Sequence, residues 1–213
     1  MPALKDFLKQ IREELKEKEA VREKMQSNAR KATSLSKQSI LLIHQKKLKE
    51  AKKLLRNASR IIHDLCETAG KYPDVAHSGM LSAARQEYAE AAIFLKLVEH
   101  ESFAAPEEVK VPSIDYALGL ADVIGECRRL ALDALREGDG EKGERCLEIM
   151  DEIYVELMSM DEAYMLVPGL RRKCDVARKV IEITRGDITQ EIRRSAHEKR
   201  LEGLANLKSK KKT

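Results

Sequence analysis

Two pairs of acidic residues have the types and spacing that metal-assisted chemistry requires. Glu87 and Glu90 stand three residues apart in one segment, and Asp122 and Glu126 stand four apart in another. In a helix, residues at these spacings share one face, so each pair points both carboxylates the same way. If the two helices pack antiparallel, the four carboxylates meet across one seam. Oxygen-only ligands in this number suit Mg²⁺ or Mn²⁺, which activate water for attack on a phosphodiester.

The neighbours of both pairs differ from those of acids on an ordinary solvated helix face. Ala91 and Phe94 lie near the first pair, and two carboxylates beside apolar residues are costly to bury without a cation. Gly119 precedes the second pair and Gly125 lies between its two members, although each glycine costs a helix about 1 kcal/mol relative to alanine. We therefore expect another helix, or a ligand, to approach closely there. Most single Glu-x-x-Glu pairs are solvated surface, so the inference depends on the two pairs together.

The elements that must position these acids are predicted to be helices. Leu, Ala, Glu, Lys and Arg dominate, aromatic residues make up 4% of the chain, and hydrophobic residues still reach 43%. This composition favours an all-α fold with a real core over a disordered chain. We predict a seven-helix bundle with very long antiparallel helices, forming a single domain over residues 1–207 with a basic tail at 208–213. The first predicted helix runs to about residue 45, the second covers about 48–69, and the third begins near 78 and includes residue 98. Three more cover 113–137, about 141–160 and 170–184. After a break at Arg185-Gly186, a seventh begins at about 187 and fades into the basic tail.

Positive charge is concentrated in one window of the chain. Residues 30–60 carry ten Lys or Arg against one acid, Glu50, which gives +9 in a chain of net charge +4 and leaves −5 elsewhere. Such asymmetry favours a surface that faces a polyanion. Arg30, Lys31 and Lys37 fall along one side of the first predicted helix and are predicted to contact phosphates. The alternative for Lys37 is an ion pair with an acid of a neighbouring helix.

The cysteines and the N-terminus predict the compartment. The four cysteines are far apart in the sequence and form no Cys-x-x-Cys motif, which argues against a zinc site or a disulfide framework. The N-terminal segment is charged from Lys5 onward and does not read as a secretory signal. No apolar stretch approaches the roughly 18 residues that span a bilayer. We expect a cytoplasmic protein with no membrane partner.

Several motifs resemble those of the translin/TRAX family. Residues 27–44 (SNARKATSLSKQSILLIH) resemble the family's first-helix signature, and residues 86–91 (QEYAEA) are similar to a motif of the TRAX branch. Residues 115–126 (DYALGLADVIGE) resemble a further family stretch, and residues 169–175 (GLRRKCD) fall where the family has Leu-Arg-Lys elements. These matches occur in order over roughly residues 20–190, which makes a chance resemblance a poor explanation.

The resemblance implies a function and a site. The TRAX branch supplies endoribonuclease activity in an octameric barrel, whereas translin itself binds nucleic acid and lacks the acids. Carried over by motif, Glu87, Glu90, Asp122 and Glu126 become the catalytic and Mg²⁺-binding set (with Mn²⁺ as the alternative ion), and Arg129 touches the scissile phosphate. This sequence lacks the long insert of eukaryotic TRAX, so it looks like the short archaeal-type members. The implied protein is a homo-oligomer, octamer-like, that cleaves single-stranded RNA, with DNA as an alternative ligand.

Four other functions compete with this one. A translin-like protein that binds RNA or DNA without cutting it would keep the acids as remnants. An all-α nucleotide pyrophosphohydrolase also uses Glu-x-x-Glu, but the basic window favours a polymer over a mononucleotide. A di-iron bundle is disfavoured because no histidine has a Glu three residues before it. A metal-free ribonuclease that depends on histidine is disfavoured because the histidines stand at unrelated spacings.

Overall fold

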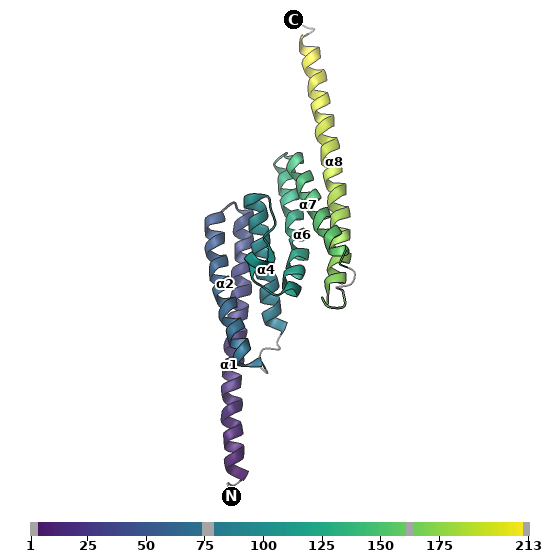
Figure 1. The fold of residues 1–213 in the computed structure, drawn as a ribbon. Coiled ribbons are helices and arrows are strands. Elements are labelled where there is room, and N and C mark those ends of the chain that lie inside the picture. Colours follow the sequence, from purple (N-terminus) through teal and green to yellow (C-terminus); the bar gives the residue numbers. More distant parts are fainter. Residues whose placement is uncertain (1–3, 74–78, 161–163, 211–213) are drawn as a thin grey trace. The chain divides into compact units, whose positions relative to one another are not determined.

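The computed structural model describes residues 4–73, 79–160 and 164–210, with side chains as far as residue 200 except Lys199. Over these residues the chain forms seven helices and no strand, which confirms the all-α seven-helix prediction (Figure 1). The helices are α1 (Leu4–His44), α2 (Leu48–Lys71), α4 (Gly79–His100), α5 (Pro106–Val109), α6 (Ser113–Arg136), α7 (Gly140–Met158) and α8 (Leu170–Lys210). The predicted start of the third helix at Ser78 and the last tail residues, 211–213, lie outside the described residues. No described helix is long and apolar enough to cross a membrane.

The structure differs from the prediction in two places. One predicted break is absent and one short helix was not predicted, so the number of helices in the described residues is still seven. The predicted break at Arg185-Gly186 is wrong, because α8 runs without interruption through both residues. Gly186 has no side chain to pack, but helices tolerate an isolated glycine at a cost of about 1 kcal/mol. The connector around residues 103–112 instead contains the short helix α5, whose first residue is Pro106. Proline suits that position because the first turn of a helix has no hydrogen-bond acceptor for its N–H.

The chain divides into two compact units, Met1–Leu120 and Ala121–Thr213, with the boundary inside α6. Each unit is described by itself below. The single domain expected over residues 1–207, with its tail at 208–213, stays a prediction.

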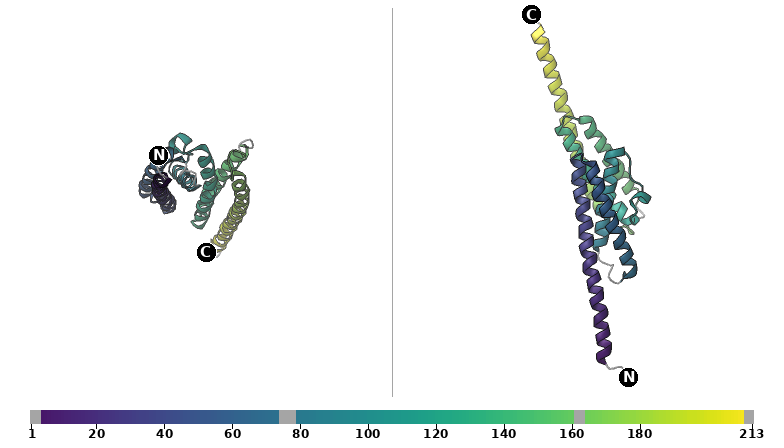
Figure 2. Two further views of the ribbon diagram at one scale, coloured as in Figure 1. Left: turned by 90° about the horizontal axis from the view of Figure 1, so that it is seen from below. Right: turned by 90° about the vertical axis from the view of Figure 1, so that its left-hand side faces the viewer.

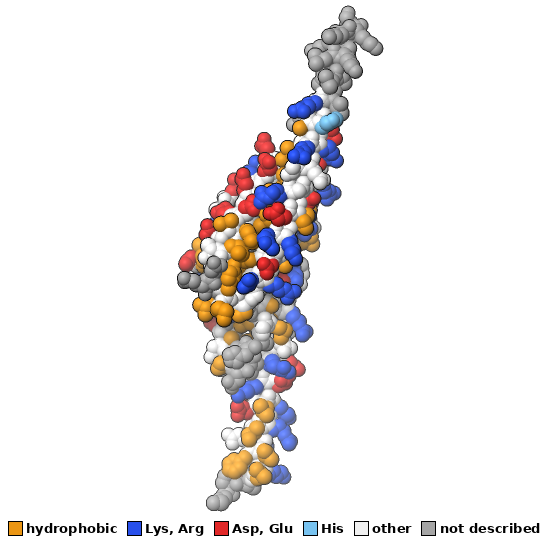
Figure 3. Space-filling view, turned by 90° about the vertical axis from the view of Figure 1, so that its right-hand side faces the viewer, with side chains coloured by type: hydrophobic (Ala, Val, Ile, Leu, Met, Phe, Trp, Pro, Cys, Tyr) orange, Lys and Arg blue, Asp and Glu red, His pale blue; other side chains and the backbone are white. Residues whose placement is uncertain are grey.

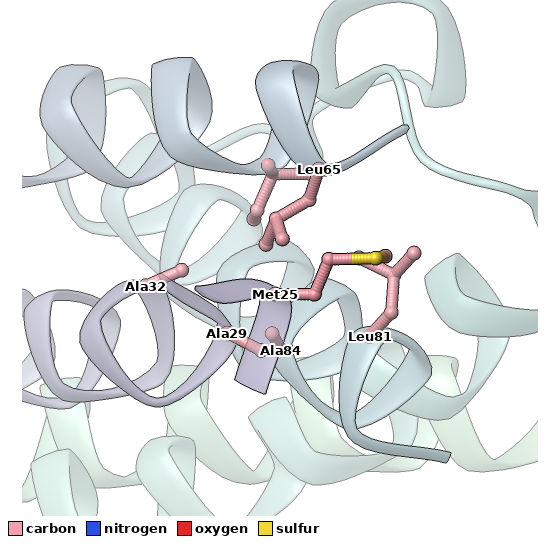
Figure 4. Close-up of a cluster of buried hydrophobic side chains, with 7 residues drawn as sticks. Met25, Ala29, Ala32, Leu65, Leu81 and Ala84 are labelled. Carbon is pink, nitrogen blue, oxygen red and sulfur yellow. The ribbon is translucent and has the colours of Figure 1, made fainter. Parts of the chain in front are cut away.

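The first unit is built on α1, α2 and α4, whose ribbons run side by side in the views of Figures 1 and 2. Its core contains the buried side chains Met25, Ala29, Ala32, Ile62, Leu65, Leu81 and Ala84, most of them labelled in Figure 4. Three of these are alanines, two from α1 and one from α4. Their small side chains let the helix backbones approach closely. The buried Ser39 hydroxyl of α1 donates to the carbonyl of Ala51 in α2 at 3.1 Å, which adds a polar link between these helices.

The second unit is built on the rest of α6 with α7 and α8. Gly138, with φ of +80°, ends the α6 segment, and the Asp139 side chain then accepts from the Lys142 N–H at 2.9 Å to cap α7. Arg128 of α6 ties this helix to α8 by donating to Thr184 Oγ1 at 2.7 Å and to Asp187 at 3.1 Å. The fully buried side chains of Met150, Ile153 and Leu170 fill the space between the helices.

Both units leave apolar side chains in contact with solvent. In the first, the N-terminal part of α1 exposes Leu8, Ile11 and Leu15 by 50–59% at spacings of three and four residues, which makes one stripe. In the second, Met165 and Leu166 precede α8 and are exposed by 90% and 72%. The space-filling view of Figure 3 shows hydrophobic side chains gathered beside Lys and Arg side chains on the face that it presents.

Candidate functional site

Helix α4 presents the first carboxylate pair at the edge of the core of the first unit. Glu90 is only 9% exposed and is followed by the fully buried Ala91 and, one turn on, Phe94. Glu87 is 26% exposed, and its carboxylate pairs with the ammonium of Lys37 from α1 at 3.2 Å. The alternative expected for Lys37, an ion pair with an acid of a neighbouring helix, is therefore present, and the acid is a member of the candidate metal set.

Gly119 lets the start of α6 approach the backbone of α4 beside this pair. A Cβ placed on Gly119 would stand 2.7 Å from the Gln86 carbonyl oxygen and 3.0 Å from the Glu90 nitrogen. No side chain fits at these distances, so the close approach expected at this glycine is confirmed. Gly125 is different, because apart from its chain neighbours and the backbone of its own helix, no described atom lies within 4 Å of the place where its Cβ would stand. Its backbone faces open space, as a surface for a ligand would.

A buried polar cluster joins the same stretch of α4 to the first turn of α6. The Asp115 carboxylate is 3% exposed, accepts from the Ser82 hydroxyl and lies 3.7 Å from the Arg85 guanidinium. Gln86, directly before the first candidate acid, donates to the Ser82 oxygen at 3.1 Å. A buried carboxylate that is hydrogen-bonded and ion-paired fixes its partners, since any shift would leave a charge without its bonds. The cluster therefore sets the position of α4 at the candidate acids.

A groove of about 390 Å³ runs between α1 and α4 on the first unit. It combines cationic and hydroxyl groups with an apolar floor, and its lining consists of Ala29, Arg30, Thr33, Ser34, Lys37, Gln38, Met80 and Ala83. Two of the three α1 residues predicted to contact phosphates, Arg30 and Lys37, thus lie along one groove. Lys31 is exposed on α1 and is not part of this lining.

In the second unit, α6 carries the other carboxylate pair at the edge of a second groove. The Lys173 ammonium of α8 donates to both carboxylate oxygens of Asp122, and the two side chains are 28% and 37% exposed. Glu126, one turn further along α6, is half-buried. Asp122 and Lys173 line a groove of about 460 Å³ between α6 and the first turns of α8. Arg129, predicted to touch the scissile phosphate, is exposed on α6.

The four candidate acids are thus described as two pairs, one in each unit. No group of three or more His, Cys, Asp or Glu side chains that would hold a metal ion occurs in the part of the chain that is described. The donor set still suits a hard divalent cation, because all four members are carboxylates and one is almost fully buried. In each pair, moreover, one carboxylate already binds a cation of this chain, Lys37 at Glu87 and Lys173 at Asp122.

Three of the four cysteines are core residues. All four are free, and three of them, Cys127, Cys146 and Cys174, are buried. Burial raises the pKa of the Cys127 thiol far above its ordinary value. Because the thiolate is the nucleophilic form, a buried thiol with a raised pKa is inert. Cys127, Cys146 and Cys174 therefore act as small core residues.

Sequence reasoning missed two of these features. Asp115 entered only as the first residue of the 115–126 motif, and its buried contacts with α4 were not predicted. Lys173 entered only as part of a family motif. A signal for it exists, because the first turn of α8 contains Arg171, Arg172 and Lys173 after Leu170 and has no acid. Cations there oppose the helix dipole, and such an arrangement points to a role other than helix stability.

The protein is all-helical, and in each unit an acidic pair lies beside a groove lined by Lys or Arg. The Translin family description matches residues 6–182, and the chain belongs to this family. An uncharacterized protein of Methanocaldococcus jannaschii is 34% identical over 193 residues, which covers 88% of this chain and 85% of that protein.

Solved structures with the same fold are also similar in sequence. The crystal structure of AfC3PO and the structure of an AfC3PO–duplex RNA complex each match with a TM-score of 0.77 and 36% identity. They cover 86% of this chain and 96% and 95% of theirs, respectively. The crystal structure of apo-NeC3PO, at 23% identity and a TM-score of 0.77, covers 90% of this chain and 98% of its own and shares the fold.

Proposed function

We propose that this protein is a Mg²⁺-dependent endoribonuclease that cleaves single-stranded RNA inside a homo-oligomer. The observation that carries the proposal is the same in both units: a candidate carboxylate is neutralised by a lysine, and that lysine lines a groove. A carboxylate set that attracts cations, next to grooves rich in cations, suits a phosphodiester held at a metal ion. Nothing in this arrangement requires a histidine or cysteine nucleophile.

The residues proposed to hold the ion are Glu87, Glu90, Asp122 and Glu126. When bound, Mg²⁺ supplies an activated water and charge stabilisation at the phosphodiester. The buried Glu90 and the close contact at Gly119 give the first pair a fixed position. Lys37 and Lys173 neutralise Glu87 and Asp122 before the ion binds, which keeps the repulsion between the carboxylates low.

RNA binding is proposed for the basic residues of α1 and for Arg129. Arg30 and Lys37 line the groove on the first unit, beside hydroxyl groups that suit phosphate oxygens. AfC3PO, which is 36% identical to this chain, has been solved with duplex RNA. We propose a preference for single strands because a seam between helices is narrow and a duplex cannot easily expose one strand to it.

The exposed apolar stripe of α1 supports the association of several subunits. An exposed Leu and Ile stripe along α1 is costly in water and is covered when subunits associate. We propose a homo-oligomer of the octamer-like barrel type, assembled from one kind of subunit. A stable monomer of about 24 kDa at micromolar concentration in light scattering would contradict this part of the proposal.

The test is cleavage of end-labelled RNA by the purified full-length protein. We expect single-stranded RNA to be cut with Mg²⁺ and to stay intact with EDTA. Products should carry 5′-phosphate and 3′-hydroxyl ends, since the route needs no attack by a 2′-hydroxyl. Duplex RNA and single-stranded DNA of the same sequence are the matched controls, and both should be cut more slowly.

A translin-like protein that binds RNA without cutting it is the second candidate. The same two ion pairs favour it, because lysines that neutralise the acids permanently would leave no place for a metal ion. Tight RNA binding with no cleavage at any Mg²⁺ concentration would select this function and exclude the nuclease.

A further inference from the structure

The groove between α6 and α8 in the second unit has a feature that the proposed nuclease function leaves unassigned. Its volume, about 460 Å³, falls within the range of sites that enclose small molecules. Asp122 and Gly125 line it from α6, and Arg172, Lys173 and Val176 line it from α8. The groove thus places charged groups and an apolar wall side by side.

The charges of this groove favour an anion. Lys173 binds both oxygens of Asp122, and Arg172 precedes it on the exposed first turn of α8. Two cations against one acid leave a net positive charge. Arg offers a planar fork and Lys a mobile ammonium, and both are strong donors to phosphate oxygens. A phosphate group is therefore the anion that this groove fits best.

The remaining surface of the groove favours a sugar and base. Gly125 leaves open space above its backbone, because no described atom beyond its chain neighbours and its own helix backbone lies within 4 Å of where a Cβ would stand. On the other side Val176 is 54% exposed, and Ala177 and Val180 continue the wall. A planar or compact apolar group gains contact there and removes the valine from water. Phosphate together with an apolar ring describes one nucleotide.

We propose that the α6–α8 groove is a subsite for one nucleotide of the RNA, in which Arg172 and Lys173 bind the phosphate. Val176 and the open backbone at Gly125 receive the sugar and base. Lys173 exchanges Asp122 for the phosphate, because an ion pair between partly exposed side chains is weak. The subsite rests on the proposed function in taking RNA as its ligand, but nucleotide binding at it does not require cleavage.

The chain provides matched controls for both cations. Arg171 precedes Arg172 and is equally classed as exposed, but it does not line the groove. Lys179 lies on α8 and lines a different surface hollow. Arg171→Gln and Lys179→Met therefore remove the same charges as Arg172→Gln and Lys173→Met, without touching the subsite.

The experiment is calorimetric titration of the full-length protein with adenosine 5′-monophosphate in EDTA, so that only contacts with the protein are measured. We expect Arg172→Gln and Lys173→Met each to weaken binding by about tenfold or more, and the two controls by less than about twofold. Equal affinities for all four variants, or wild-type protein that binds no nucleotide up to about 10 mM, would overturn the subsite.

A groove-filling variant guards against effects on folding. Gly125→Leu removes a glycine from a helix and places a side chain in open space, so the melting temperature should stay the same or rise. Nucleotide binding should nevertheless be lost. A Gly125→Leu protein that binds adenosine 5′-monophosphate as tightly as wild type would also overturn the proposal.

The outcomes separate the subsite from the nuclease. RNA cleavage that continues at the wild-type rate in Arg172→Gln and Lys173→Met, with unchanged nucleotide binding, removes the subsite and leaves the nuclease intact. Nucleotide binding that depends on Arg172 and Lys173, in a protein that never cleaves RNA, supports the subsite and removes the nuclease.

Discussion

The two carboxylate pairs share a residue pattern but occupy different surroundings. Glu90 of α4 is almost fully buried, next to a backbone contact at Gly119 that leaves no room for a side chain. Asp122 of α6 is 37% exposed and borders a groove, with open space at Gly125 nearby. Even the lysine partners differ, since Lys37 is 62% exposed and Lys173 only 28%.

The difference bears on the proposed metal-assisted chemistry. Under that proposal, the pair on α4 supplies carboxylates that dense packing holds in place. The pair on α6 supplies carboxylates at the edge of a groove that is open to a substrate. A single helix face could not easily provide both, because the packing that fixes a side chain also excludes a ligand.

The largest expected effect comes from removing one charge from each pair. Glu90→Gln and Asp122→Asn keep the size of the side chain but remove a charged oxygen ligand. Each should lower RNA cleavage by about 100-fold or more, which corresponds to about 2.7 kcal/mol in the barrier. RNA binding in a filter assay should survive in both. Loss of cleavage in one variant and full activity in the other would show that the two pairs do not serve one site.

The next prediction compares a buried ion pair of the first unit with a half-exposed ion pair of the second. Asp115→Asn removes the charge of a buried carboxylate bound to Ser82 and Arg85, and should cost about 2–3 kcal/mol in the free energy of unfolding. Asp187→Asn is the matched change at a half-exposed pair with Arg128 and should cost about 1 kcal/mol or less. Urea unfolding curves measure both. Equal costs would contradict the contrast in packing.

Substituting alanine at the two glycines of α6 should change the free energy of unfolding in opposite directions. Gly119→Ala places a Cβ about one ångström too close to α4 and should destabilise by about 1–3 kcal/mol despite the better helix former. Gly125→Ala meets open space and should stabilise by about 0.5–1 kcal/mol. Thermal unfolding of both variants gives the answer. A destabilised Gly125→Ala would mean that something covers this backbone in the folded protein.

The smallest effect concerns the basic face of α1. Neutralising Arg30, Lys31 and Lys37 together should weaken RNA binding regardless of sequence and lower the salt dependence of log K by about 2. Lys37 also holds Glu87, so its loss removes an ion pair as well as a phosphate contact. Neutralising three exposed lysines earlier in α1 (Lys9, Lys16 and Lys24) is the control for net charge. Unchanged affinity and salt slope in the first triple variant would contradict the assignment.

Sequence alone was sufficient for several features that have a local cause. Helical spacing placed each acidic pair on one helix face, composition identified an all-α fold, and the glycine beside Asp122 signalled a close approach that Gly119 confirms. The break at Gly186 was a local inference that failed. A glycine lowers helix propensity by only about 1 kcal/mol, and packing of the buried Ile181, Thr184 and Ile188 along α8 outweighs that cost.

Tertiary structure alone decided the partners of the charged residues. Lys37 stands 50 positions before Glu87, and Lys173 stands 51 positions after Asp122, so no periodicity in the sequence relates them. No sequence periodicity relates Asp115 to its partners either. Its buried carboxylate contacts Ser82 and Arg85 only because α4 packs beside the first turn of α6. Hydrogen bonds within a helix depend on neighbours three or four residues away, whereas an ion pair between helices depends on how their faces meet. That meeting is set by the packing of side chains across the whole unit, so these contacts appear only in the folded structure.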